Sequence, residues 1–225
     1  MTTHRTSRAS HETSSPRRRN CLSRYTGPKV RKMRALQTYL SGLSTKSMEH
    51  RSHKPGQHGQ NMRRKTSDFG LQLAEKQKIQ FNYGLREKQL RRLMVEARRS
   101  DMATGHKLLE LLERRLDNTV FRAGFGRTIP AARQLVSHGH VQVNGRRVDI
   151  ASYQVKVGDM IQLRQRSRNL ESVRESISSI RLARPDWLQC NYAEMSATVM
   201  ANPTPDSASV EVDVARVVEF YAKRG

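Results

Sequence analysis

The sequence has 225 residues, of which 42 are Lys or Arg and 20 are Asp or Glu, so its formal net charge is +22. This length allows one domain or two small ones and excludes a large multidomain enzyme. The longest run without a charged residue, from Gln134 to Gly145, is too short to cross a bilayer. Cys21 and Cys190 are the only cysteines, so a disulfide framework is excluded and a reducing compartment is favoured.

The positive charge is unevenly distributed along the chain. Residues 1–65 carry a net charge of +14 and residues 66–184 carry +11, whereas residues 185–225 carry −3. Solubility alone needs a net charge of only about 2 to 8 in a small domain. The composition therefore favours a nucleic-acid partner, because Lys and Arg neutralise phosphates and release their counterions.

The first 65 residues contain little regular periodicity. Residues 1–24 show no hydrophobic period, and we predict a disordered basic arm there; an organelle transit peptide and a start codon placed too early are alternative explanations. Residues 25–65 mix basic residues with turn formers, including Gly27-Pro28. This second stretch is predicted to expose backbone for contact with a partner.

Helical periodicity begins near residue 68. Apolar residues recurring every three or four positions predict two helices over residues 68–99, broken at Tyr83-Gly84. Many of the remaining positions are basic, and acids are too few to pair with them all. Thr104 is predicted to cap a strong helix that continues through Phe121.

A shorter helix and a hairpin follow. Thr128 is a suitable N-cap for this helix, and Gly139 is expected to end it. From residue 141 the apolar period changes to two, and Asn144-Gly145 is a favoured two-residue hairpin turn. The second helix and the hairpin are predicted to present polar and basic side chains on one surface: Arg133, Gln134, Ser137, His138, Asn144, Arg146 and Arg147.

The predicted fold class is α+β, with a mainly helical N-terminal domain and a small domain of two short helices and a small antiparallel sheet. Further strands are expected at residues 154–157 and 160–163, so that this small domain occupies residues 105–166. A polar helix-like segment follows it. Residues 195–209 are expected to form a loop, and residues 210–221 a strand or short helix.

Several short motifs occur in a distinctive order along the chain. They are Tyr25-Thr26-Gly27-Pro28-Lys29, Pro55-Gly56-Gln57-His58-Gly59, Glu75-Lys76-Gln77-Lys78 with Tyr83-Gly84, Arg115-Leu116-Asp117-Asn118 with Arg122, Ala132-Arg133-Gln134-Leu135-Val136-Ser137-His138-Gly139, Val141-Gln142-Val143-Asn144-Gly145 and Ile150-Ala151-Ser152-Tyr153. This set resembles the S-four family of small-subunit ribosomal proteins over roughly residues 23–224. The later motifs resemble the family's S-four RNA-binding domain.

The resemblance implies a domain organisation and a set of RNA-binding residues. The expected divisions are an arm at 1–24, a basic region with a helical domain at 25–113, an RNA-binding domain at 114–174 and a C-terminal segment at 175–225 that packs back on the helical domain. The matched positions assigned to RNA are Lys54, Gln57, His58, Arg63, Arg64, Lys65, Lys76, Tyr83, Arg114, Arg115, Arg122, Arg133, Gln134, Ser137, His138, Asn144 and Arg146. Arg133 and Arg146 are both expected at the surface.

The resemblance also implies a function. The expected protein is a structural constituent that binds the 5′ domain of 16S-type ribosomal RNA, nucleates assembly of the subunit body and contributes to translational accuracy. Its expected partners are this RNA and small-subunit proteins five and, functionally, twelve, with no enzymatic activity, cofactor, small-molecule substrate or membrane. A ribosome in the bacterial cytoplasm is the first expected location and an organelle ribosome the second. Some members of the family repress translation of their own operon.

An RNA-modifying enzyme that carries the same binding domain is the main alternative function. That class needs a second, catalytic core, and the flanks of the binding domain offer none that spacing can identify. Gly124 and Gly126 lack the third glycine of a dinucleotide-binding loop. Asp117 follows an arginine pair and is predicted to orient Arg114 or Arg122 rather than to act as a catalytic acid.

Two further hypotheses, a DNA-binding protein and a zinc site, fit the residues less well. Two short helices could enter a major groove, but the surface is expected to follow a folded RNA junction by its shape and backbone. Some members of the family hold zinc near the N-terminus with closely spaced cysteines. Cys21 with His50, His53 and His58 is a poor match to four regularly spaced ligands, so no metal is expected.

Overall fold

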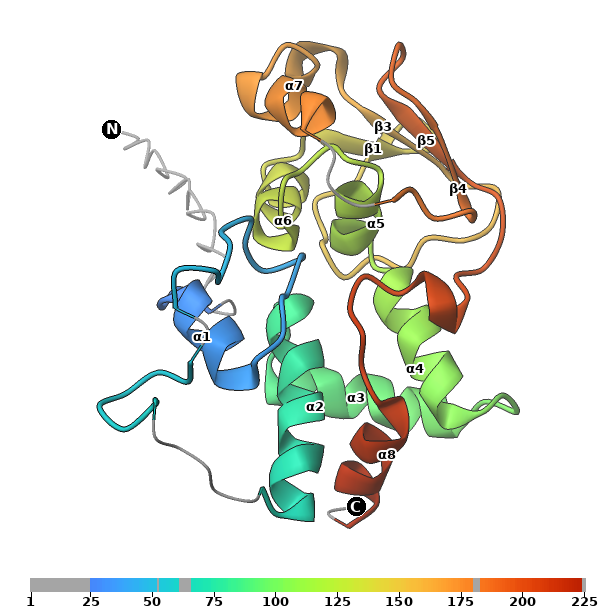
Figure 1. Ribbon diagram of the computed structural model, residues 1–225. Coiled ribbons are helices and arrows are strands. Elements are labelled where there is room, and N and C mark those ends of the chain that lie inside the picture. The colour runs from blue at the N-terminus through green and yellow to red at the C-terminus, as the bar shows by residue number, and fades with distance from the viewer. Residues whose placement is uncertain (1–24, 52, 61–65, 180–182, 224–225) are drawn as a thin grey trace, which may run out of the picture.

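The computed structural model describes residues 25–51, 53–60, 66–179 and 183–223 (Figure 1). The predicted arm at 1–24 and the predicted RNA-binding residues Arg63, Arg64 and Lys65 lie outside these ranges. The architecture is α+β, as the sequence predicts, and consists of a helical part and a sheet part. No helix in the described ranges has the length and apolar character needed to cross a bilayer.

The helical part is built from both ends of the chain. It comprises α1 (Lys29–Leu36), α2 (Asp68–Asn82), α3 (Glu87–Arg98), α4 (Thr104–Glu113) and α8 (Val214–Ala222). Figure 1 shows α8 beside α2, and residues of α8 also contact α3 and α4. Two of these helices begin with a side-chain cap, because Ser67 accepts from the Gly70 amide and Asp213 accepts from the Arg216 amide.

The sheet part contains the second group of elements. Its helices are α5 (Leu116–Arg122), α6 (Ile129–Ser137) and α7 (Glu171–Ser178), and its strands are β1 (Val141–Val143), β2 (Arg146–Arg147), β3 (Met160–Leu163), β4 (Leu188–Asn191) and β5 (Ser196–Val199). The five strands form an antiparallel sheet in the order β2-β1-β3-β5-β4. Figure 1 shows α5 and α6 between this sheet and the helical part. Short 3-10 turns lie at Gln165–Ser167 and Pro205–Ser207.

Several predicted elements are confirmed. The helical stretch after residue 68 does break at Tyr83-Gly84, where Gly84 has a positive φ of 60°. Thr128 caps α6 by accepting from the Ala131 amide, and Gly139 ends the helix with a φ of 73°. The β1–β2 hairpin turns at Asn144-Gly145, where both residues have positive φ as a type I′ turn requires.

The prediction of one long helix from Thr104 to Phe121 is wrong, because the structure has two helices over these residues. Thr104 is the first residue of α4 and Ala103 is its N-cap, while Arg115 is extended between α4 and α5. The amide of Leu116 donates to the carbonyl of Tyr153 at 2.8 Å, and the amide of Val155 donates to the carbonyl of Arg114 at 2.9 Å. The apolar period continues across the break, so the sequence pattern alone does not show it.

Two other predictions about strands and loops are wrong. Residues 154–157 form no strand of the sheet; Gln154 makes an isolated bridge to Arg115 instead, because this segment satisfies the backbone at the α4–α5 break. The expected loop at 195–209 contains β5, which lies between β3 and β4. The C-terminal segment therefore contributes two strands to the sheet part and one helix to the helical part.

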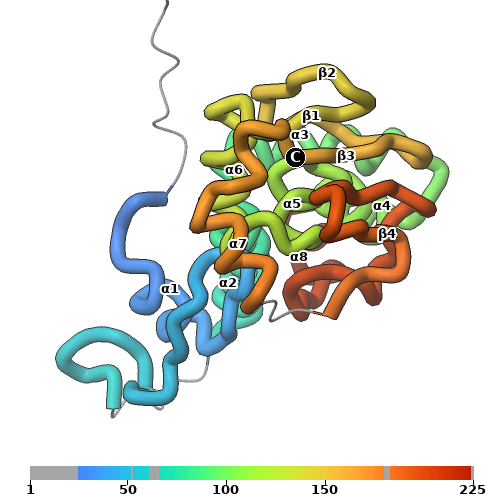
Figure 2. The backbone as a smooth tube through the Cα atoms, turned by 90° about the horizontal axis from the view of Figure 1, so that it is seen from above, coloured from blue at the N-terminus to red at the C-terminus, as the bar shows by residue number. Residues whose placement is uncertain are grey.

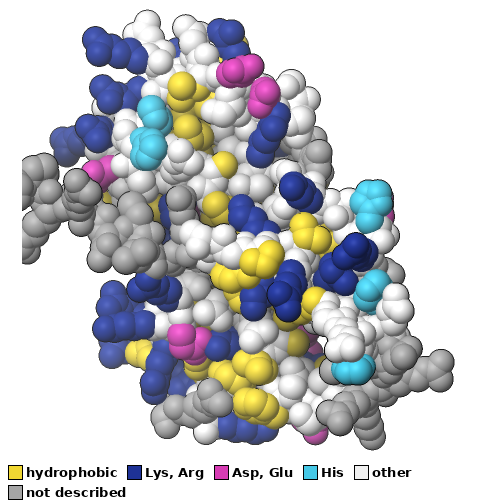
Figure 3. Space-filling view, turned by 90° about the vertical axis from the view of Figure 1, so that its left-hand side faces the viewer, with side chains coloured by type: hydrophobic (Ala, Val, Ile, Leu, Met, Phe, Trp, Pro, Cys, Tyr) yellow, Lys and Arg dark blue, Asp and Glu magenta, His cyan; other side chains and the backbone are white. Residues whose placement is uncertain are grey.

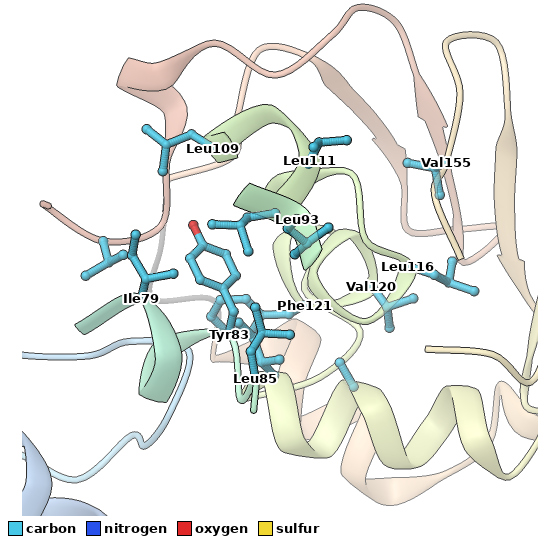
Figure 4. Close-up of a cluster of buried hydrophobic side chains, with 14 of the residues drawn as sticks. Ile79, Tyr83, Leu85, Leu93, Leu109, Leu111, Leu116, Val120, Phe121 and Val155 are labelled. Carbon is cyan, nitrogen blue, oxygen red and sulfur yellow. The ribbon is translucent and has the colours of Figure 1, made fainter. Parts of the chain in front are cut away.

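The apolar core runs without interruption from the helical part into the sheet part. Figure 4 shows the ring of Tyr83 among the side chains of Ile79, Leu85 and Leu93, with Phe121 of α5 close by. These side chains are almost completely buried. Continuous burial of this kind stabilises one arrangement of the two parts, because separating them would expose apolar surface to water.

A buried carboxylate joins three segments within this core. Glu113 is fully buried at the end of α4. Its carboxylate accepts hydrogen bonds from the Tyr83 hydroxyl at 2.6 Å, the Asn118 side-chain amide at 2.8 Å and the Ser209 backbone amide at 3.2 Å. Burial, and then the negative charge of Glu113, raise the pKa of Tyr83 well above its ordinary value, so this hydroxyl stays a donor.

Replacing Tyr83 with phenylalanine should lower the free energy of unfolding by about 1.5–3 kcal/mol, because the buried Glu113 carboxylate loses a donor that water cannot replace. Urea denaturation followed by circular dichroism measures this change. Tyr39→Phe is the matched control, since Tyr39 is 44% exposed and its hydroxyl should contribute little. Equal urea midpoints for the two variants would contradict this role of Tyr83.

Candidate nucleic-acid interface

The surface predicted on α6 and the hairpin is largely present. Gln134, Ser137 and His138 are exposed on α6, while Ala132 and Val136 on the opposite side of the helix are buried. Asn144 and Arg146 are exposed at the hairpin. The structure therefore brings five of the predicted residues to the surface on two adjoining elements.

The hairpin holds its basic residues on a rigid turn. The Asn144 side chain donates to Asp159 at 2.8 Å and accepts from the Met160 amide at 2.9 Å, which fixes the turn against the start of β3. Arg146 and Arg147 follow immediately on β2, and both are exposed. Asn144 is thus tied to the protein through its side chain, whereas the guanidinium of Arg146 lies at the surface.

The end of α6 lies beside two arginines, Arg147 and Arg164, that are not among the residues assigned to RNA from the sequence. A Cβ on Gly139 would lie 2.2 Å from Nε of Arg147, so Arg147 lies directly over this glycine. Arg164 donates to the carbonyl of Gly139 at 3.4 Å. Cations near a helix C-terminus are favoured by the helix dipole. The sequence places Arg164 just after a strand, but its position beside α6 depends on the β1–β3 pairing.

Two histidines lie next to these arginines. Nδ1 of His140 lies 2.8 Å from the Ser167 hydroxyl, and the rings of His138 and His140 are 6.0 Å apart. Burial, and then the positive charges of His138, Arg164 and Arg147, lower the pKa of His140 below its ordinary value. The lowered pKa favours the neutral form of His140, and the arginines supply fixed positive charge beside it.

The loop at residues 53–60 forms a second candidate surface. Gln57 and His58 are exposed and Lys54 is half-buried, and Figure 2 shows this loop extending outward beyond α1. Nε of Arg34 donates to the carbonyl of His53 at 3.1 Å. A Cβ on Gly59 would lie 1.9 Å from the carbonyl oxygen of Lys54, so the loop needs glycine there.

The helical part adds exposed positive charge that the predicted residue set left out. Figure 3 shows the face seen from the side of α1 and α6, where Lys and Arg side chains are spread widely and Asp and Glu side chains are few. The third helix, α3, and its two cap residues also expose six basic side chains: Arg86, Lys88, Arg91, Arg92, Arg98 and Arg99. Their alternation with apolar positions in the sequence indicates a basic helix face, although none of them was assigned to RNA.

Arg133 is not at the surface, contrary to the prediction. Its side chain is only 14% exposed. The guanidinium donates to Asp117 at 2.5 and 2.9 Å and to the carbonyls of Tyr83 at 2.9 Å and Gly84 at 2.8 Å. Arg133 therefore joins α6 of the sheet part to the end of α2. The periodicity of the sequence marks residue 133 as a polar position, but the helical part of the structure covers it.

Asp117 also has different partners from those predicted. It is fully buried and accepts from Arg115 at 3.0 and 3.1 Å as well as from Arg133, rather than orienting Arg114 or Arg122. The Arg122 side chain is 7% exposed and donates to the carbonyl of Ser207 at 2.8 Å. The guanidinium groups of Arg115, Arg122 and Arg133 therefore bond to carboxylates and carbonyls within the protein.

Three more of the predicted RNA-binding residues point into the protein. Arg114 donates to Glu110 and to the carbonyl of Val155. Lys76 is buried, pairs with Glu87 and lies over the ring of Phe220. Tyr83 is the fully buried donor to Glu113 described above. The RNA-binding assignment stays a prediction, and its best-supported members are the exposed residues on α6, the hairpin and the 53–60 loop.

The structure offers no metal centre in the ranges it describes: no group of three or more His, Cys, Asp or Glu side chains lies close enough together to hold an ion. Cys21, one of the residues weighed as a zinc ligand, lies outside these ranges. The chemistry available at the surface is therefore that of guanidinium, amide, hydroxyl and imidazole groups. Such groups bind phosphates and the edges of bases.

Replacing Arg133 with alanine should lower the free energy of unfolding by about 3 kcal/mol, because Asp117 and two backbone carbonyls lose their shared donor inside the protein. Arg146→Ala is the control, and we expect its stability to change by less than about 0.5 kcal/mol. Urea denaturation of both variants provides the measurement. Wild-type stability in the Arg133 variant would show that the two parts are held together without this contact.

Comparison with known families identifies the class of protein. A family model described as the S4 domain matches residues 114–161, and a model described as the ribosomal protein S4/S9 N-terminal domain matches residues 24–113. The first match contains α5, α6 and the hairpin, and the second contains α1 to α4. The chain is thus an S4-domain protein whose helical part also has a ribosomal counterpart.

Individual relatives identify the family. The chain is 54% identical to small ribosomal subunit protein uS4 of Methylobacillus flagellatus over 204 residues, which are 90% of this chain and all of the relative. It is 50% identical to uS4B of Nitrosomonas europaea over the same shares, and 44% identical to uS4 of Streptococcus mutans over 90% of this chain and 99% of the relative. The chain belongs to the uS4 family of small ribosomal subunit proteins. It is a ribosomal protein and not an RNA-modifying enzyme with the same binding domain.

Proposed function

We propose that this chain binds small-subunit ribosomal RNA directly, with the α6 end and the β1–β2 hairpin as one principal contact surface. The observation that carries the proposal is that Arg147 and Arg164 both lie beside Gly139 at the C-terminal end of α6, while Arg146 is exposed next to Arg147 on β2. Guanidinium groups hold phosphates through two parallel hydrogen bonds, and fixed positions reduce the entropy lost on binding.

The family resemblance supports a more specific role within the ribosome. The proposed target is a multi-helix junction in the 5′ domain of 16S-type RNA, where binding would nucleate assembly of the subunit body. Contacts with small-subunit protein five, and a functional connection to protein twelve, would account for an influence on translational accuracy. A bacterial cytoplasm is the proposed compartment, consistent with the bacterial relatives.

The charge of the chain favours a structured RNA over a protein partner. The net charge of +22 exceeds what solubility requires, and it is carried largely by residues 1–184. Binding driven by released counterions should weaken steeply with salt, with a slope near −0.9 in log–log form for each duplex phosphate contacted. A junction should be preferred because the basic surfaces lie on separate elements that a straight duplex would not follow.

Arg146→Ala should weaken binding to a 5′-domain transcript of bacterial 16S RNA roughly tenfold and reduce the salt slope by about one, because one phosphate contact is removed. Filter binding at several salt concentrations measures both quantities. Arg216→Ala is the matched control, since this arginine lies on α8 and pairs with Asp213. Equal affinity in the two variants would remove Arg146 from the proposed surface.

The wild-type chain should bind the 5′-domain transcript more tightly than linear duplex RNA or duplex DNA of equal length. The physical reason is that a folded junction can contact several of the basic surfaces at once. Competition filter binding with the three nucleic acids tests this preference directly. Equal affinity for all three would indicate unspecific attraction to polyanions and would contradict the proposed function.

A further inference from the structure

A groove between α6 and α7 lies beside the proposed RNA surface. Its volume is about 330 Å³, and Figures 1 and 2 show the two helices lying next to each other. Phe125, which is fully buried, contributes to the lining together with the half-buried side chains of Leu135 and Leu170. Gln134 and His138, both exposed, also line it from α6.

We propose that this groove holds one unstacked nucleobase of the bound ribosomal RNA, an inference that rests on the proposed function. A base has two apolar faces and a polar edge, so it needs apolar walls together with a few hydrogen-bonding groups. The half-buried side chains of Leu135 and Leu170 provide apolar surface. The Gln134 amide can donate and accept at the same time, as recognition of a base edge requires.

The charges around the groove favour a base over a phosphate. Arg127 and Glu175 both line it, and they pair with each other at 2.8 Å, so the positive charge of this arginine is already balanced. Arg147 and Arg164 lie instead around Gly139, at the end of the same helix. A nucleotide could therefore place its phosphate near Arg147 or Arg164 and its base between α6 and α7.

The position of His138 supports the same arrangement. His138 is exposed, lines the groove and lies next to His140, whose ring belongs to the cluster with Arg147 and Arg164. A backbone that follows the arginines would therefore pass the mouth of the groove. Base-specific recognition of RNA commonly uses nucleotides splayed out of the stack in this way.

Ser172→Leu tests the proposal by filling the groove. Ser172 is exposed on the first turn of α7 and lines the groove, so a leucine there should occupy part of the space for a base. Ser178→Leu is the matched control, because Ser178 is exposed on the same helix and its hydroxyl bonds only to carbonyls of α7. The probe is the 5′-domain transcript, with affinity measured by filter binding and base accessibility by dimethyl sulfate.

With the wild type and Ser178→Leu, one unpaired base should be protected from dimethyl sulfate. Ser172→Leu should restore its reactivity and weaken binding about tenfold, which corresponds to the loss of one stacked base. Gln134→Ala, a second variant that leaves α7 unchanged, should partly restore reactivity of the same base. Agreement of the two variants on one nucleotide would support the groove as its binding site.

An unchanged affinity and footprint with Ser172→Leu would overturn the base-binding groove while leaving the RNA-binding function intact. Equal weakening by Ser172→Leu and Ser178→Leu would also overturn it, because the effect would then come from α7 as a whole. Failure of the wild-type chain to bind the transcript at all would instead refute the proposed function. The three results are distinct, so each hypothesis can fail separately.

Discussion

Two buried carboxylates at the break between α4 and α5 constrain the whole arrangement. Glu113 and Asp117 are both fully buried, and such groups are costly unless donors surround them. Their donors come from separate parts of the chain: Tyr83 at the end of α2, Arg133 on α6 and the amide of Ser209 in the C-terminal segment. Satisfying these two carboxylates therefore fixes the helical part, the sheet part and the C-terminal segment relative to one another.

This constraint divides the arginines into two groups. Arg115, Arg122 and Arg133 are held against buried carboxylates or carbonyls. Arg146 and Arg147 lie exposed on the hairpin. A guanidinium is suited to both tasks because its planar fork binds carboxylates and phosphates alike. Whether an arginine joins protein segments or is available to RNA is thus decided by burial and not by residue type.

The division between buried and exposed arginines also shows which features of the structure the sequence could predict. The Thr128 cap and the Asn144-Gly145 turn are local signals, and the structure confirms both. Burial of Arg133 requires the end of α2 to cover α6, which is a contact between residues some fifty positions apart. A helical period marks Arg133 as polar but does not show what faces it.

The same limit applies to the strands. Ser196–Val199 shows no clear alternation, yet it becomes an interior strand of the sheet because β3 and β4 flank it. The α4–α5 break is equally non-local, since residues 151–155 supply its hydrogen bonds. Local patterns therefore predicted the elements of the candidate RNA surface better than they predicted the contacts that position it.

The two edges of the sheet carry different charges, which has a consequence for how RNA would approach. One edge strand, β2, consists of Arg146 and Arg147, whereas the segment around the opposite edge, β4, combines the exposed acids Asp186 and Glu194 with the exposed Arg184. Charged edges disfavour pairing with strands of other molecules. A polyanion would also be attracted more strongly to the β2 edge than to the mixed charges around β4. Approach from the β2 side would bring the RNA to the arginines around α6 and to the mouth of the groove between α6 and α7.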